Sequence, residues 1–182
     1  MEKTESQTDS SISDLVMELL VVVDQSYTSY HKEDTLNYTK LLLTGANDLF
    51  QHPSLGLGPE FPESRVKSFQ LKLVDFGTLD MNLDIFFPKG EDYFFKFNIK
   101  NGYLKTEDSV FSTFDYDGVL FLTRLNLVRI LGHDAIGYSV AWSACRRLNF
   151  RIIQDCGLFT SKIIAHEVGH MYDEFHIPIY SP

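Results

Sequence analysis

Apolar residues along the chain fall into short runs that are separated by polar and turn-forming stretches. The runs at 19–23 and 117–123 are rich in Leu, Val and Phe, and each predicts a strand that is buried on both faces. Residues 66–74 mostly alternate apolar with polar positions, which predicts a half-buried strand. Two further strands are predicted at 136–142 and 150–154.

Two helices are predicted between and after these strands. Residues 33–50 place their leucines on one broad helical face, and the stretch 53–64, which is rich in proline and glycine, predicts a loop after it. The second helix is predicted at 160–172, with Thr160 or Ser161 as its N-cap. Strands that alternate with helices indicate the α/β class, with a mainly parallel sheet of about five strands and flanking helices.

The length and net charge of the chain indicate one acidic globular domain. Residues 1–13 are polar and predict a disordered tail, which leaves 14–182 as a single domain with room for a core. The net charge is −9 without any run of Lys and Arg, so we expect no nucleic-acid partner. The apolar run at 15–23 is too short for a membrane span and lacks the flanks of a signal peptide. No feature of the sequence sets an oligomeric state.

The candidate chemistry lies in the segment His166-Glu167-Val168-Gly169-His170. On a helix, His166 and His170 are one turn apart on the same face, so their imidazoles can converge on one metal ion. Zinc suits neutral imidazoles and keeps a coordination position for water. Glu167 adjoins the first histidine, where it can take a proton from that water and return it to a leaving amine.

A third histidine makes the pattern more specific. His176 comes six residues after His170, too far to share its helical face, so the chain must turn sharply near position 173. Such a turn often needs a positive φ, and Asp173 is one of the residue types that tolerate it. We therefore predict a zinc site of His166, His170 and His176, with Glu167 as the general base in peptide-bond hydrolysis.

The spacing of these residues resembles the metzincin signature H-E-x-x-H-x-x-G-x-x-H, with Asp173 at the glycine position. Within the metzincins, the chain is similar to the reprolysin group of ADAM and ADAMTS proteases. The similarity extends to segments upstream of the motif, at 17–24, 117–123, 137–145 and 153–158. It implies a metzincin (zincin-like) fold and an extracellular zinc endopeptidase that acts on protein or peptide substrates.

The resemblance also implies roles for residues outside the motif. Gly137, Tyr138 and Ser139 match the antiparallel edge strand that lines the active-site cleft, which implies that they bind an extended substrate by strand addition. Glu18 matches a residue that joins a structural calcium site in some reprolysins, which makes Ca²⁺ a candidate second ion. The other ligands of such a site are expected near the C-terminus, where this sequence lacks them, so the favoured interpretation of Glu18 is a simple solvated acid.

Two departures from the reprolysin pattern support an alternative function. Ile177 stands where reprolysins usually have Asp, and the methionine turn that metzincins need does not occur before Pro182. The C-terminal part of the catalytic domain is therefore expected to be truncated. The alternative to an endopeptidase is an inactive zinc-binding relative that acts as an interaction module.

The sequence predicts the roles of the remaining histidines and of the cysteines less specifically. His31, His52 and His133 have no metal-ligand spacing, so we expect surface or capping roles for them. Cys145 and Cys156 are the only cysteines, and they could form one disulfide or remain free thiols.

Overall fold

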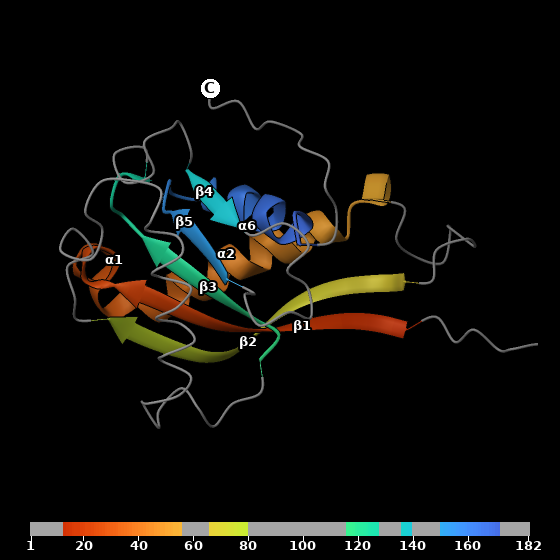
Figure 1. Ribbon diagram of the computed structural model, residues 1–182, viewed down its shortest axis with the longest axis horizontal. Helices are drawn as coiled ribbons and strands as arrows, with labels where there is room; N and C mark the ends of the chain where they lie inside the picture. Colours follow the sequence, from red (N-terminus) through yellow and green to blue (C-terminus); the bar gives the residue numbers. More distant parts are fainter. Residues whose placement is uncertain (1–12, 56–65, 80–115, 128–135, 140–149, 172–182) are drawn as a thin grey trace, which may run out of the picture.

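The computed structural model describes the central sheet, three α-helices and their nearest connections (Figure 1). The described residues are 13–55, 66–79, 116–127, 136–139 and 150–171. The predicted N-terminal tail lies outside these residues except for Ser13, which is the first residue of a strand.

Five strands form one sheet in the order β2-β1-β3-β5-β4. Their bounds are β1 Ser13–Asp24, β2 Val66–Leu79, β3 Gly118–Thr123, β4 Gly137–Ser139 and β5 Phe150–Gln154. The first, second, third and fifth strands are parallel, and β4 runs antiparallel to β5 at the edge. This confirms the predicted α/β class, the mainly parallel sheet of five strands and the antiparallel edge strand.

Burial on both faces of the sheet explains why the sequences of β1 and β3 are almost continuously apolar. In β1, Leu19, Val21 and Val23 pack on the face of the sheet that the helices cover. Leu20 and Val22 point to the opposite face and are buried there as well. A strand buried on both faces needs apolar residues at successive positions, which is the pattern that predicted β1 and β3.

Helices α2 (Thr35–Phe50) and α6 (Thr160–Gly169) cover one face of the sheet, and their apolar faces share a core cluster with it (Figure 1). Helix α1 (Gln25–His31) follows β1 directly and was not predicted, because its sequence is mostly polar. It begins there because the Asp24 carboxylate accepts a hydrogen bond from the Tyr27 N–H at 2.9 Å. Short 3₁₀ helices occupy Lys32–Asp34 and Pro53–Leu55.

The prediction of Thr160 or Ser161 as the N-cap of α6 was wrong. The helix begins at Thr160, but the cap position is Phe159, and no side chain caps it. The Thr160 hydroxyl instead accepts a hydrogen bond from the Cys156 N–H at 2.8 Å and donates one to Asp155 at 3.1 Å. A tertiary partner therefore competes for the group that would otherwise cap the helix. Among the described residues, no helix is long and apolar enough to cross a membrane.

Candidate metal centre

Helix α6 places the two histidines of the motif side by side. Its buried face, which includes Ile163, Ile164 and Val168, packs against the sheet and fixes the rotation of the helix. The Nε2 atoms of His166 and His170 lie 2.9 Å apart, and their rings meet edge to face with centroids 4.4 Å apart. The predicted convergence of these two imidazoles on one point is therefore present in the structure, and their role as zinc ligands stays a prediction.

Glu167 lies between the two histidines in sequence and close to both in space. Its side chain is buried, and one ligand atom from each of His166, Glu167 and His170 lies within 4.8 Å of the others. Burial raises the pKa of Glu167 to about 7, while the Ser139 hydroxyl and the positive charge of Arg151 act in the opposite direction. A carboxyl group in this environment can both accept and donate a proton near neutral pH.

The edge strand β4 and its neighbour β5 lie against Glu167. Ser139 is opposite Arg151 in the antiparallel register, and Gly137 is opposite Ile153. Tyr138 packs against the core cluster on the other face of the sheet, so Gly137 and Ser139 face α6. Their predicted role in substrate binding stays a prediction, and strand addition would use the backbone groups of this edge strand.

Arg151 is a part of this centre that the sequence did not reveal. It is fully buried in β5, and arginine is a residue type that is seldom fully buried. The sequence gives one signal for this burial: Arg151 stands between the apolar residues Phe150 and Ile152 of β5.

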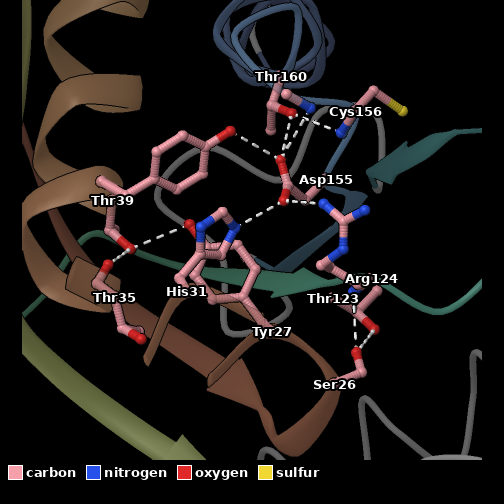
Figure 2. A network of polar contacts seen from close by, with 12 residues as sticks. Ser26, Tyr27, His31, Thr35, Thr39, Thr123, Arg124, Asp155, Cys156 and Thr160 are labelled. Carbon is pink, nitrogen blue, oxygen red and sulfur yellow. Dashed lines mark hydrogen bonds and ion pairs between the residues drawn. The ribbon is translucent and has the colours of Figure 1, made fainter. Parts of the chain in front are cut away.

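A second polar cluster holds the beginning of α6 in place (Figure 2). Asp155 follows β5 and is buried, with Oδ2 at 2.8 Å from both His31 Nε2 and Arg124 Nη1. Its Oδ1 accepts hydrogen bonds from Tyr38 Oη at 3.0 Å and from Thr160 Oγ1 at 3.1 Å. One carboxylate therefore joins α1, α2, the end of β3 and the start of α6.

The charged state of Asp155 follows from the balance of these contacts. Burial alone would raise its pKa, but hydrogen bonds from His31, Arg124, Tyr38 and Thr160 outweigh burial and lower it. Asp155 is therefore ionised near neutral pH, and it holds the helix that carries the two histidines.

The expectation of a surface or capping role for His31 was wrong. Its side chain is only 10% exposed, its ring stacks on Tyr38 with centroids 4.0 Å apart, and it pairs with Asp155. The partners lie 124 positions apart in sequence, so no local spacing could reveal the pair. His52 does lie on the surface, where its Nδ1 is 2.8 Å from the Ser54 hydroxyl.

Glu18, the candidate calcium ligand, has protein partners in the structure. Its carboxylate pairs with Lys72 Nζ at 2.6 Å, and its backbone N–H donates to Asp117 Oδ2 at 2.8 Å. Calcium binding at Glu18 stays a prediction. Cys156 is exposed and is a free thiol in the structure.

Several predicted residues lie outside the described part of the chain. They include the turn and ligand residues that follow α6, one histidine and one cysteine: Asp173, His176, Ile177, His133 and Cys145. The last residues of the strand predicted at 136–142 lie outside it as well, because 140–149 are not described.

Comparison with known proteins gives a distant relative that is named as a metalloproteinase. The chain is 25% identical over 175 residues to a disintegrin and metalloproteinase with thrombospondin motifs 4 of Rattus norvegicus. The alignment covers 88% of this chain and 24% of the relative, so the chain spans about a quarter of that protein's length. No protein-family model matches the chain.

Site geometry and comparison agree at a coarse level. The chain is distantly similar to a metalloproteinase, and it contains a His-Glu-His group that could bind a metal ion. The similarity extends over most of the chain.

Proposed function

We propose that this chain is the catalytic domain of a zinc-dependent endopeptidase of the metzincin type, related to the reprolysins. The observation that carries the proposal is the 2.9 Å approach of His166 Nε2 and His170 Nε2 beside the buried Glu167 carboxyl group. The distant similarity to a metalloproteinase supports it. An extracellular location follows from the same reprolysin resemblance, as part of the proposal.

The donor atoms of the centre fit zinc. Two imidazole nitrogens this close can both reach one ion at bond lengths of about 2.0–2.1 Å, and zinc accepts N and O ligands in a tetrahedral site. His176 is proposed as the third ligand. When bound, zinc would lower the pKa of a coordinated water molecule and polarise the substrate carbonyl group.

The chain's own residues supply the remaining steps. Glu167 accepts a proton from the attacking water and delivers it to the leaving nitrogen of the cleaved peptide bond. The backbone of β4 holds the substrate in an extended conformation as an additional strand. Asp155 keeps α6 in place, and with it the two histidines and Glu167.

Metal analysis tests the proposed ligands. We expect one zinc ion per chain in the purified protein, and loss of that zinc in a His166→Ala/His170→Ala double variant. His52→Ala is the matched control, because this histidine lies on the surface of the chain. Full zinc occupancy in the double variant would contradict the proposed site.

A peptidase assay tests the proposed reaction. Glu167→Gln keeps the shape of the side chain but cannot accept the proton, so we expect hydrolysis to fall by more than about 10²-fold while zinc stays bound. Hydrolysis should also stop when a chelator is added. Zinc binding without hydrolysis in the wild type would favour the alternative, an inactive zinc-binding module. Loss of zinc in Glu167→Gln would instead identify Glu167 as a metal ligand, which its distance to the histidines allows.

A further inference from the structure

The backbone of β4 approaches the Glu167 side chain more closely than a residue with a Cβ atom could without displacing a neighbouring group. A Cβ atom on Gly137 would lie 2.7 Å from Oε1 and 3.0 Å from Cγ of Glu167, and 2.8 Å from Cγ2 of Ile163. Real Cβ atoms essentially never come closer than 3.0 Å to a heavy atom of a residue that is not their own or a chain neighbour. Glycine at position 137 is therefore what leaves room for the Glu167 carboxyl group.

This need for glycine does not come from its backbone conformation. Gly157 is the one described glycine with a positive φ, at 72°, whereas Gly137 does not have a positive φ and pairs with Ile153 in the sheet. Glycine within a strand normally weakens the strand, and it often marks the close approach of another group. Here that group is the end of Glu167.

The other groups around the carboxyl group limit where it can go. Ser139 lies two positions along the same face of β4, and the fully buried Arg151 lies opposite Ser139 on β5. Glu167 itself is 5% exposed, so its carboxyl group cannot turn to solvent without leaving this space. A methyl group on Gly137 would displace the flexible end of Glu167 more easily than it would displace the strand.

We propose that Gly137 is a positioning residue for Glu167, which sets the place of the Glu167 carboxyl group by leaving space for it against β4. The inference rests on the proposed function for its effect on catalysis, but the contact itself concerns only the fold. It also differs from the substrate-binding role expected from the sequence, because it acts through the missing side chain of Gly137 and not through its backbone.

A double-mutant cycle tests the contact without any need for activity or metal. Gly137→Ala is measured by thermal unfolding in the wild type and in a Glu167→Ala background, where Oε1 and Cγ are gone. We expect Gly137→Ala to lower the Tm in the wild type and to lower it clearly less in the Glu167→Ala background; a remainder is expected from Ile163. Gly169→Ala is the matched control, because its Cβ would meet nothing within 4 Å. Equal losses in both backgrounds would overturn the proposal.

Kinetics separate positioning from substrate binding. If the chain is a peptidase, Gly137→Ala should retain zinc, lower kcat by on the order of 10²-fold and leave KM within a few fold, because a displacement of about 1 Å at the base costs this much. An unchanged kcat with a raised KM would overturn the positioning role and support substrate binding by this residue. A wild type without hydrolysis would count against the proposed function, and the unfolding cycle would still decide the contact between Gly137 and Glu167.

Discussion

The substitution Asp155→Asn tests whether a single carboxylate holds the helix of the metal centre. The amide is nearly isosteric with the carboxylate but carries no charge. The bonds from Arg124 and His31 to Oδ2, each 2.8 Å long, then lose their anionic acceptor. An NH₂ group at the Oδ1 position would face the Gly157 N–H, which now donates to Oδ1 at 3.1 Å and can only donate.

The expected cost follows from burial. Removal of one partner from a buried ion pair costs about 3–5 kcal/mol, because the other charge remains without compensation. The Asp155 side chain is fully buried, but that of Arg124 is 31% exposed, and water will partly solvate its guanidinium group. We therefore expect the free energy of unfolding to fall by about 3 kcal/mol, which corresponds to a drop in Tm of roughly 6–12 °C for a chain of this size.

Urea unfolding at neutral pH, followed by circular dichroism, measures this loss. Asp48→Asn is the matched control, because Asp48 is exposed on α2 and its substitution should change stability by less than about 0.5 kcal/mol. A loss in Asp155→Asn below about 1 kcal/mol, or equal to that of the control, would refute the role of Asp155 as the anchor of α6.

The pH dependence of the free energy of unfolding tests the role of Asp155 independently. The pKa of Asp155 is lowered in the folded state, since its hydrogen bonds outweigh burial. Its contribution to stability is therefore present above its unfolded-state pKa, about 3.9, and is lost as the pH falls through the lower folded-state value. The stability gap between the wild type and Asp155→Asn should narrow below about pH 4. A gap that widens on acidification would contradict this assignment.

Three further predictions concern other parts of the molecule. Gly45→Ala should cost about 1–3 kcal/mol, because its Cβ would lie 2.7 Å from Ser161 Oγ, and Ser161→Ala should restore part of the loss in urea unfolding. Lys72→Gln should cost less than about 1 kcal/mol, because the side chains of Lys72 and Glu18 are 59% and 37% exposed. Zinc at 100 times its Kd should add about 2.7 kcal/mol to the stability, reversibly with a chelator; an unchanged Tm would contradict binding to the folded state.

The sheet was predictable because its signal lies in neighbouring residues. The apolar runs of β1 and β3 and the alternation in β2 each follow from which faces are buried, so they gave the strands and the α/β class. Helix α1 gave no such signal. Only Tyr27 among its residues is buried, and the cap on Asp24 that starts the helix uses a residue that also ends the preceding strand.

The candidate metal centre also contains some residues that the sequence predicted and others that it did not. His166 and His170 were predictable because a spacing of four residues has one geometric meaning on a helix. The residues that pack around Glu167 were not. Gly137 and Arg151 approach Glu167 only after β4 and β5 pair and α6 packs on them, and an isolated glycine or arginine in a strand occurs in many different structural settings.

The Asp155 cluster has a consequence for how the chain reaches its native state. A ribosome releases His31 and Tyr38 more than a hundred residues before Asp155, the carboxylate that both of them contact. Contacts of such high sequence separation form slowly, because a long loop must close before any stabilisation is gained. The bonds from His31 and Tyr38 to Asp155 can therefore form only after residue 155 has been synthesised, and until then the two side chains lack this shared acceptor.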